Sequence, residues 1–280
     1  MFRNSGAPQV SVVVPAENEA ADLRDVLPLL DVSYQVILVD GHSVDGTIEV
    51  AEELRPDITV VQQTRKGKGN ALAAGFHAAT GDIIVMFDAD GSADPAEIPR
   101  FVGALVAGAD FAKGSRFADG GGSSHDITYL RKWGNEGLNF VANRLFGARF
   151  TDLCYGYNAF WRDLVGTLQL PPLHAVAPEG GMLWGDGFEI ETLINCRFAA
   201  ARVPITEVPS LELARIHGES NLRTFADGTR VLRTLVAERR RASRRAPVIP
   251  LRVTPPAGRR LVTVPSADDF VDDDVFERIS

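Results

Sequence analysis

Two carboxylates stand one residue apart at the end of a short apolar run. Asp88 and Asp90 follow the run Ile83–Phe87 and precede Gly91. A run of this length and composition is typical of a buried strand. Both side chains can turn toward one cation. Mg²⁺ prefers carboxylate, phosphate and water oxygens, so the pair suits such a hard cation. The alternative is a loop with two solvated acids, but the strand before the pair and the glycine after it favour a metal site.

A glycine- and lysine-rich segment, RKGKGN at residues 65–70, precedes an alanine-rich stretch. Glycines let the backbone approach an anion, a helix N-terminus attracts it, and lysines add positive charge. The segment therefore predicts a diphosphate-binding loop. It lacks the spacing of a P-loop, and no G-x-G-x-x-G follows the first apolar run, so NTPase and dinucleotide-binding functions are poorly supported.

Polar segments follow two further apolar runs. The segment 15–19 (PAENE) follows the run Val10–Val14, and the segment 40–45 (DGHSVD) follows the run Val36–Val39. Each segment alone is as typical of a turn as of a site. In an open α/β sheet, ligands bind beyond the carboxyl ends of the strands. Three polar clusters, each at a strand end, therefore predict one shared site.

The elements that must position these residues alternate between strands and helices, which indicates an α/β domain. A long loop is expected at Pro171–Trp184, and the glycine run at 120–122 marks another. Asp94 and Pro95 have the residue types of a helix N-cap and first turn. The predicted strands are Val10–Val14, Val36–Val39, Ile58–Val61, Ile83–Phe87 and Ala109–Lys113, and the predicted helices are Ala20–Leu30, Gly46–Leu54, Gly69–Ala79, one opening at Asp94, and Arg131–Phe146.

Composition excludes several classes of protein. The chain has 280 residues, of which 45% are hydrophobic and 24% charged, as in an ordinary globular domain. It has two cysteines without metal-ligand spacing, no signal-peptide pattern and no apolar run of membrane-spanning length. We therefore expect a cytoplasmic protein. The net charge of −8 argues against a general nucleic-acid binder.

Taken in order, the motifs resemble those of family 2 glycosyltransferases with the GT-A fold. The resemblance is strongest to the branch of dolichyl- and polyprenyl-phosphate mannosyl- or glucosyltransferases, and it covers roughly residues 9–225. It implies a Rossmann-like mixed sheet flanked by helices. The motifs that carry it are VVVPAENE, LVDGHSVDGT, RKGKGNAL, MFDADGSADP, KGSRF from Lys113, TDLCYGYN from Thr151, GFEIE from Gly187 and RIHGES from Arg215.

The resemblance implies a binding site for a nucleoside diphosphate sugar, with UDP or GDP as the nucleotide. Pro15, Glu17 and Asp40 would hold the base and ribose. Asp45 would support their loop. Lys68 would approach the diphosphate.

The resemblance also implies a divalent cation, Mg²⁺ or Mn²⁺, bridging that diphosphate. Asp88 and Asp90 would bind it, with Asp88 also near the ribose. His217 is a third candidate ligand or a phosphate contact, and a hydrogen-bonded loop histidine is the alternative. Relatives in the dolichyl branch often place a Gln two residues after the second Asp, where this chain has Ser92. The third protein ligand is therefore open.

Two arginines and two acids are candidates for the acceptor side. The resemblance places Arg116 and Arg131 by the donor phosphates or by an acceptor phosphate. Asp152 and Glu189 are candidates for binding the sugar or acting as a general base, although Glu189 also suits a helix-flanking role. A hydroxyl acceptor needs such a base, whereas a phosphate acceptor is already anionic at neutral pH.

The segment Phe225–Arg245 has the pattern of a basic amphipathic helix. From 230 to 245 it carries seven arginines and one glutamate. Such helices can lie on anionic membranes, and the alternative is a helix packed on the domain with a solvated arginine face. We therefore expect a GT-A domain over residues 1–225, this helix over 226–246, and a loose tail over 247–280.

The sequence thus predicts metal-dependent, inverting transfer of a sugar from a nucleoside diphosphate sugar to a polyprenyl phosphate. Peripheral contact with the membrane would let the enzyme reach such a lipid. A hydroxyl of a soluble metabolite is the alternative acceptor. A non-catalytic nucleotide-sugar-binding protein is the alternative from another class, and the intact Asp88/Asp90 pair argues against it.

Overall fold

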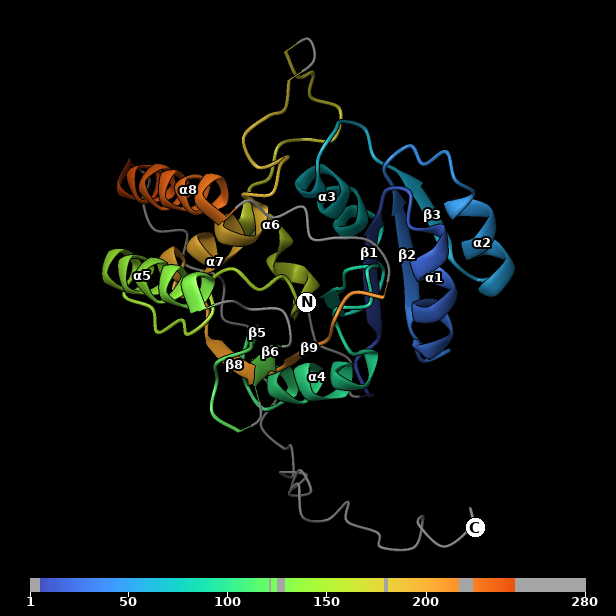
Figure 1. Ribbon diagram of the computed structural model, residues 1–280, viewed down its shortest axis with the longest axis horizontal. Coiled ribbons are helices and arrows are strands. Elements are labelled where there is room, and N and C mark those ends of the chain that lie inside the picture. The colour runs from blue at the N-terminus through green and yellow to red at the C-terminus, as the bar shows by residue number, and fades with distance from the viewer. Residues whose placement is uncertain (1–5, 121, 125–128, 179–180, 217–223, 245–280) are drawn as a thin grey trace, which may run out of the picture. The chain divides into compact units, whose positions relative to one another are not determined.

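The computed structural model describes residues 6–120, 122–124, 129–178, 181–216 and 224–244 (Figure 1). For residues 124, 129–132 and 224–227 it describes the backbone alone. The described residues all belong to one compact unit. The predicted tail and His217 lie outside the described residues. In the part of the chain that is described, no helix is long and apolar enough to cross a membrane.

The first half of the chain forms four parallel strands in the order β3-β2-β1-β4. Runs rich in Val and Ile favour these strands, since β-branched side chains pack well on a pleated surface. The four predicted strands of this half are confirmed. The strands are β1 (Val10–Ala16), β2 (Gln35–Asp40), β3 (Thr59–Gln62) and β4 (Ile83–Met86).

Three helices connect these parallel strands: α1 (Ala20–Val26), α2 (Thr47–Leu54) and α3 (Lys68–Ala78). The predicted helix Ala20–Leu30 is shorter in the structure, because Pro28 supplies no backbone N–H and the chain continues as the 3₁₀ turn η1 (Leu27–Leu29). Helix α3 packs on β1 and β2.

The second half of the chain completes a seven-stranded mixed sheet. Strand β7 (Asn158–Trp161) lies between β4 and β5 (Phe111–Ser115) and is antiparallel to both. Strand β8 (Ile205–Pro209) adds at the edge, parallel to β5. Our sequence analysis did not predict β7 or β8. The mixed order confirms the predicted Rossmann-like sheet.

Helices of the second half cover this part of the sheet. Asp94 accepts a hydrogen bond from the backbone N–H of Ala96 at 2.9 Å, so the predicted N-cap is confirmed. Strands β6 (Ser123–Ser124) and β9 (Leu211–Glu212) form a separate pair. The helices are η2 (Pro95–Glu97), α4 (Ile98–Val106), α5 (Tyr129–Phe146), η3 (Arg162–Leu164), α6 (Val165–Leu168), α7 (Ile190–Ala200) and α8 (Thr224–Arg244).

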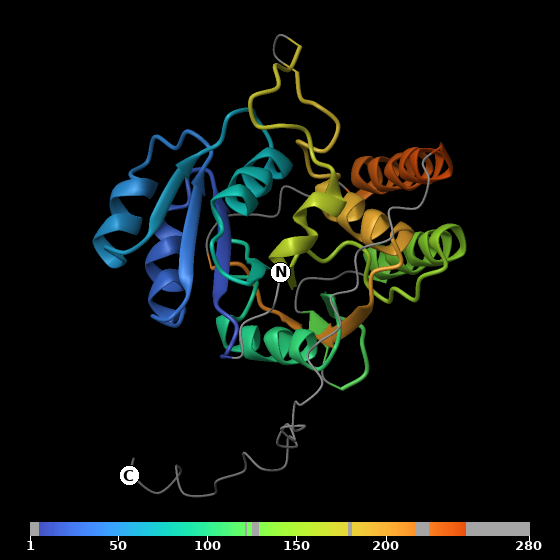
Figure 2. The same ribbon diagram turned by 180° about the vertical axis from the view of Figure 1, so that it is seen from behind.

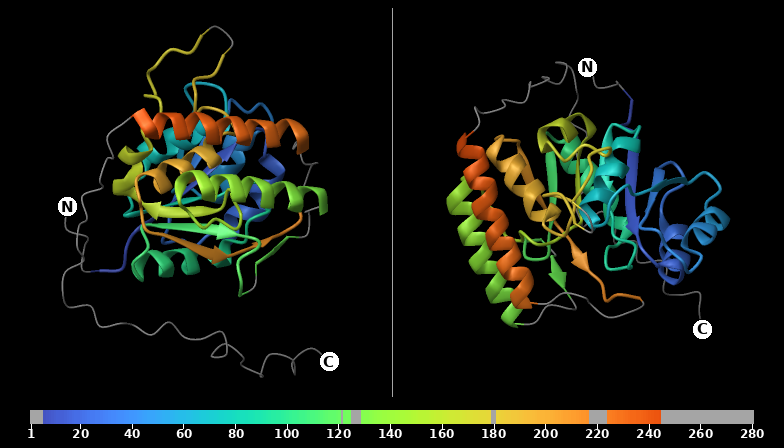
Figure 3. Two further views of the ribbon diagram at one scale, coloured as in Figure 1. Left: turned by 90° about the vertical axis from the view of Figure 1, so that its left-hand side faces the viewer. Right: turned by 90° about the horizontal axis from the view of Figure 1, so that it is seen from above.

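Helices α5, α7 and α8 pack against one another on the side of the sheet away from α1 and α2 (Figures 1 and 2). Figure 3 shows α5 and α8 running side by side. Their shared core includes Ala142, Leu153, Cys196 and Leu235. Helix α8 therefore packs on the domain that precedes it, with arginines on its exposed side.

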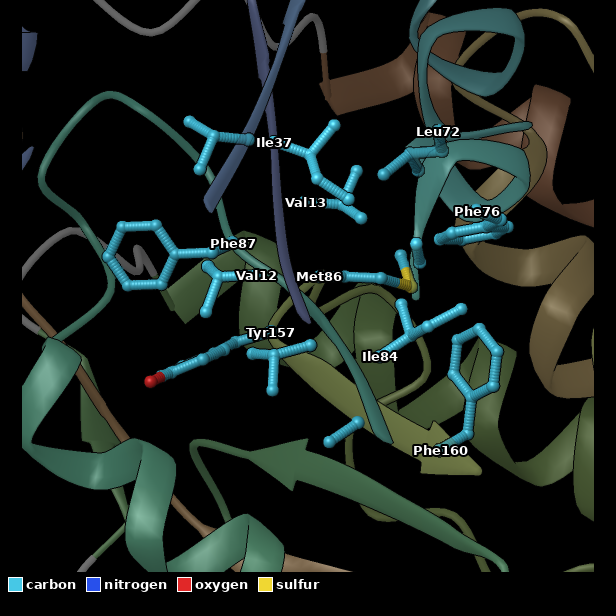
Figure 4. Close-up of a cluster of buried hydrophobic side chains, with 14 of the residues drawn as sticks. Val12, Val13, Ile37, Leu72, Phe76, Ile84, Met86, Phe87, Tyr157 and Phe160 are labelled. Atoms are coloured by element: carbon cyan, nitrogen blue, oxygen red, sulfur yellow. The ribbon is translucent and has the colours of Figure 1, made fainter. Parts of the chain in front are cut away.

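The main core lies around the junction of the two halves. Val12 and Val13 of β1 and Met86 of β4 belong to this core, and Phe160 of β7 meets Phe76 of α3 edge-on at 5.3 Å between ring centroids (Figure 4). Burying side chains of this size contributes about 1.5–3 kcal/mol each. This core fixes the ends of β1, β2 and β4 at one edge of the sheet, where the predicted site lies.

Candidate functional site

The loops after β1 and β2 meet at the carboxyl edge of the sheet. The N–H of Gly41 donates to the carbonyl of Ala16 at 2.8 Å. A Cβ added at Gly41 would lie 2.8 Å from the Cβ of Glu17, so only glycine allows this approach. Glu17 is exposed there, and Pro15 is half-buried in β1. The structure thus brings the first two predicted clusters together.

Asp40 and Asp45 hold this pair of loops. The Asp40 carboxylate is fully buried and accepts the N–H groups of His42 at 2.9 Å and Ser43 at 3.2 Å. Asp45 accepts from the Ala20 N–H at 3.1 Å and from Thr47. Burial opposes ionisation of Asp45, but these hydrogen bonds outweigh it and lower its pKa below the ordinary value. The buried Asp40 therefore fixes the loop after β2, and the exposed Asp45 joins that loop to the start of α1.

Lys68, at the start of α3, lies between two carboxylates. Its Nζ is 2.7 Å from Asp88 Oδ1 and 2.6 Å from Oε1 of Glu191, in the first turn of α7. Burial alone would lower the pKa of Lys68, but the two carboxylates raise it above its ordinary value. Lys68 is therefore charged and fixed beside Asp88, the first carboxylate of the predicted metal pair.

Asp90 pairs with a different cationic side chain. Its Oδ2 lies 3.2 Å from a guanidinium nitrogen of Arg215. Its Oδ1 accepts from the backbone N–H and the hydroxyl of Ser92, at 3.0 and 2.6 Å. Ser92 thus orients Asp90 and occupies one of its oxygens. The Ile216 N–H donates to the Asp90 carbonyl at 3.3 Å, so the segment after β9 runs over this turn.

The residues present fit a divalent cation held jointly with a diphosphate. Asp88 and Asp90 offer hard oxygen donors at a strand end where Asp88 is partly exposed, and each already attracts a positively charged side chain. Among the described residues, no group of three or more His, Cys, Asp or Glu side chains is placed to hold a metal by itself. The remaining ligands would therefore come from phosphate and water.

The RKGKGN segment contacts protein where a diphosphate was predicted. A Cβ at Gly67 would lie 2.3 Å from the carbonyl oxygen of Asp186, and one at Gly69 would lie 1.9 Å from that of Gly185. The N–H groups of Gly69 and Asn70 donate to the Asp186 carbonyl at 2.7 and 3.1 Å. We interpreted these glycines as allowing close approach of an anion, and this reason was wrong. They allow close approach of the backbone of residues 185–186, and the Asp186 carbonyl already accepts from the N-terminus of α3.

An arginine clamps the same two segments together. Arg65 makes two hydrogen bonds to the Asp186 carboxylate, at 2.8 and 2.9 Å, and the Asp186 side chain is 1% exposed. Arg65 also donates to the carbonyls of Pro172, Leu173 and Ala175. The chain between α6 and α7, yellow in Figure 1, is thereby attached to the start of α3.

Asp152 does not face an open site. Its side chain is fully buried, and both oxygens accept from Arg116, at 2.7 and 3.0 Å. Arg116 also pairs with Glu212 at 3.0 Å and lies over the ring of Tyr155. This geometry corrects the two interpretations of these residues. The carboxylate and the guanidinium satisfy each other, which suits a structural pair better than a general base and a phosphate contact.

Glu189 and Arg131 remain predictions. Glu189 Oε1 accepts the N–H groups of Gly185 at 2.8 Å and Gly187 at 3.3 Å, so it holds the turn before α7. Its second oxygen has no such role among the contacts described. Arg131 lies in α5, where the structure describes only its backbone.

Sequence analysis missed an acidic pair below the Asp90 turn. The pKa of Glu19 is raised to about 8, mainly by burial. A hydrogen bond with Asp22 and the negative charges of Asp22 and Asp90 also raise it, whereas the positive charge of Arg215 lowers it. Glu19 lies in the PAENE segment, but only the fold shows that Asp22 and Asp90 face it. The Lys68–Glu191 contact was missed for the same reason.

Comparisons with known proteins identify the family of the chain. The model of glycosyl transferase family 2 matches residues 11–168. Dolichol-phosphate mannosyltransferase of Pyrococcus furiosus is 30% identical over 228 residues, and the match spans 77% of this chain but only 59% of that protein. Glycosyltransferase AglJ of Haloferax volcanii is 30% identical over 224 residues, which are 78% of this chain and 68% of that protein.

A solved structure shares the fold. Glucosyl-3-phosphoglycerate synthase from Mycobacterium tuberculosis, in complex with Mn²⁺, UDP and glucosyl-3-phosphoglycerate, aligns with a TM-score of 0.58 at 25% identity. The alignment covers 82% of this chain and 80% of that one. The mixed sheet and its flanking helices therefore have the GT-A arrangement that the sequence predicted. The chain belongs to glycosyl transferase family 2.

Proposed function

We propose that this glycosyltransferase moves a sugar, with inversion, from a UDP- or GDP-sugar to a polyprenyl phosphate, with Mg²⁺ or Mn²⁺ bound at Asp88 and Asp90. The observation that carries the proposal is the pair of strand-end carboxylates, each beside a side-chain cation. The likeness to a dolichol-phosphate mannosyltransferase supports the choice of acceptor.

The residues at the edge of the sheet suit the charge changes of this reaction. Cleaving the sugar–diphosphate bond develops negative charge on the leaving nucleoside diphosphate. A bound divalent cation would supply Lewis-acid stabilisation of that charge. Lys68 would add a fixed positive charge on the second phosphate, and the exposed Glu17 lies at the rim where the base and ribose would bind, next to the loop that the buried Asp40 holds.

The acceptor side favours an acceptor that is already anionic. Asp152, one of the two candidate bases, is buried against Arg116. A phosphate needs no base to remove a proton at neutral pH, whereas a hydroxyl does. The second candidate function, transfer to a hydroxyl of a small phosphorylated metabolite with Glu189 as base, is supported by the likeness to glucosyl-3-phosphoglycerate synthase.

Helices α5 and α8 offer a surface for a lipid acceptor. Trp133 and Phe140 of α5 are 75% and 72% exposed, and Leu232 and Val236 of α8 are 45% and 40% exposed. Exposed arginines of α8, among them Arg233, Arg239 and Arg240, add positive charge. Aromatic and basic side chains together suit an anionic membrane surface.

Replacing Arg233, Arg239 and Arg240 with Gln tests this surface. Each cation near an anionic membrane contributes about 1 kcal/mol, so we expect about a 10²-fold weaker partition onto phosphatidylserine-containing vesicles at low salt. Arg241 is left in place because it contacts Glu238. Transfer to a prenyl phosphate in vesicles should fall, while transfer to a short water-soluble prenyl phosphate should persist.

A matched control removes the same charge elsewhere, from Arg24, Arg100 and Arg202, which lie outside α8. Equal loss of vesicle binding in the control would show that net charge alone is responsible. If the wild-type protein does not bind these vesicles and transfers sugar to phosphoglycerate instead, the soluble-acceptor function replaces the first. Binding of nucleotide sugars without hydrolysis or transfer would leave only a binding protein.

A further inference from the structure

The Lys68 ammonium is shared between two carboxylates from distant parts of the chain. Asp88 follows β4, and Glu191 lies in the first turn of α7. The Lys68 and Glu191 side chains are only 16% and 17% exposed, whereas Asp88 is 35% exposed. Glu191 is thus the less accessible of the two partners, and Asp88 is the one open to an incoming ligand.

The Glu191 carboxylate is held in place by a rigid turn. A Cβ at Gly156 would lie 2.6 Å from Glu191 Oε1 and 3.4 Å from Asp88 Oδ2, so the backbone of this turn lies against both acids. The turn itself is fixed by the buried Lys113 ammonium, which donates to the Tyr155 carbonyl at 2.8 Å. Glu191 therefore has little freedom to follow Lys68 elsewhere.

A divalent cation at Asp88 would remove one of the two partners of Lys68. Asp88 belongs to the Asp88-Ala-Asp90 pair, and Glu191 lies outside it. We propose that Glu191 is a positioning residue, which keeps Lys68 directed at the second phosphate of the donor when a divalent cation takes Asp88. This inference rests on the proposed function, because it assigns Lys68 to the donor diphosphate.

The proposed role of Glu191 and a simple charge effect predict opposite changes in diphosphate affinity when the charge of Glu191 is removed. A carboxylate near a bound diphosphate repels it, so removing the charge of Glu191 would by itself tighten binding. If Glu191 acts by holding Lys68, the same substitution weakens binding, because the ammonium is no longer fixed and its entropy must be lost on binding. The two effects can therefore be separated by one substitution.

The experiment compares Glu191→Gln with the wild-type protein, using UDP, UMP, GDP and GMP with saturating Mn²⁺ in calorimetry. For the base that the wild type prefers, we expect the diphosphate to bind about tenfold more weakly, as for a lost charge-assisted contact. The monophosphate should change less than about twofold, since it lacks the second phosphate. Thermal unfolding confirms that the variant is folded, and Glu53→Gln, which removes an exposed acid of α2, is the control.

Repeating the Glu191→Gln substitution in a Lys68→Met variant makes the test specific to Lys68. In Lys68→Met, the Glu191→Gln substitution should no longer weaken diphosphate binding, and removal of an unpaired carboxylate should leave it unchanged or tighten it. Weakening by the same factor in both backgrounds would overturn the proposal, as would unchanged or tighter binding in the single variant, or an equal loss for the monophosphate. Failure of the proposed function is distinct, because the wild-type protein would then bind neither UDP nor GDP.

Discussion

Two groups of carboxylate–cation pairs differ in how far they are removed from solvent. At the strand ends, Asp88 and Asp90 are 35% and 12% exposed, with cations that are 16% and 32% exposed. In the other group, the carboxylates are at most 2% exposed. Its pairs are Arg116–Asp152, Arg65–Asp186 and Arg197–Glu238.

This difference in exposure separates carboxylates that can change their cationic partner from carboxylates that stabilise the fold. Removing one partner of a buried pair leaves an uncompensated charge that costs several kcal/mol, so these pairs keep their partners. A partly exposed pair loses less when water or another ion replaces the partner. The strand-end carboxylates are therefore the ones that we propose for the metal and donor, whereas Asp152 is held by Arg116 within the second half and Asp186 joins that half to the segment before α3.

The largest expected effect is on catalysis. Asp90→Ala should lower sugar transfer about 10³-fold, or ~4 kcal/mol, because it removes a cation ligand that acts on the developing diphosphate charge. The unfolding free energy should change by less than about 1 kcal/mol. Turnover with the preferred nucleotide sugar measures the first quantity and urea denaturation the second. A variant that retains a tenth of wild-type turnover would remove Asp90 from the metal site.

The next effect is on stability. Asp152→Asn should lower the unfolding free energy by about 3 kcal/mol, because it leaves the Arg116 guanidinium buried with Glu212 as its remaining carboxylate partner among the described residues. Asp88→Asn, in the more exposed group of pairs, should lower the unfolding free energy by less than about 1 kcal/mol. Urea denaturation at pH 7 measures both variants. Equal losses would show that exposure does not distinguish the two groups.

A smaller effect concerns the glycines of the RKGKGN segment. Gly69→Ala should destabilise the protein by about 2 kcal/mol, because its Cβ would overlap the Gly185 carbonyl. Gly137→Ala is the control, since nothing lies within 4 Å of its Cβ in α5, and it should stabilise by up to ~1 kcal/mol. Melting curves compare the two. A neutral Gly69→Ala that still weakens UDP binding would return these glycines to the diphosphate.

The smallest effect depends on pH. The folded state raises the pKa of Glu19 to about 8 from 4.5, so it favours the protonated carboxyl, and that contribution to stability is lost as the pH rises through about 8. Glu19→Gln removes the titration beside Asp22, Asp90 and Arg215. In metal-free buffer, its melting temperature relative to wild type should rise by about 2–4 °C between pH 6 and 9. A constant difference would place Glu19 outside this acidic pair.

Local patterns predicted the parts of the fold that depend on nearby residues. The strands around Val12 and Ile84 are continuous apolar runs, and the polar residues that end them identified the edge of the sheet that carries the site. Strands β7 and β8 were missed because neither has such a run. Their strand conformation comes from pairing with β4 and β5, far away in sequence.

Residue roles that depend on distant partners could not be predicted. Gly67 and Gly69 have the local pattern of an anion-binding loop, but their reason for being glycine lies at residues 185 and 186. Asp152 is a plausible base until Arg116 is placed on both of its oxygens. Local sequence identifies which side chains can do chemistry, and long-range pairing decides which of them remain available.

The central claim is that the strand-end carboxylates Asp88 and Asp90 bind a donor through a divalent cation. Its most direct test is the thermal stabilisation of the wild-type protein by UDP or GDP, with Mn²⁺ or with a chelator. Nucleotide at 100 times its Kd should stabilise the protein by ~2.7 kcal/mol when Mn²⁺ is present. The account predicts that the chelator, or Asp90→Ala, removes most of this stabilisation. Equal stabilisation in chelator and in Asp90→Ala would contradict it.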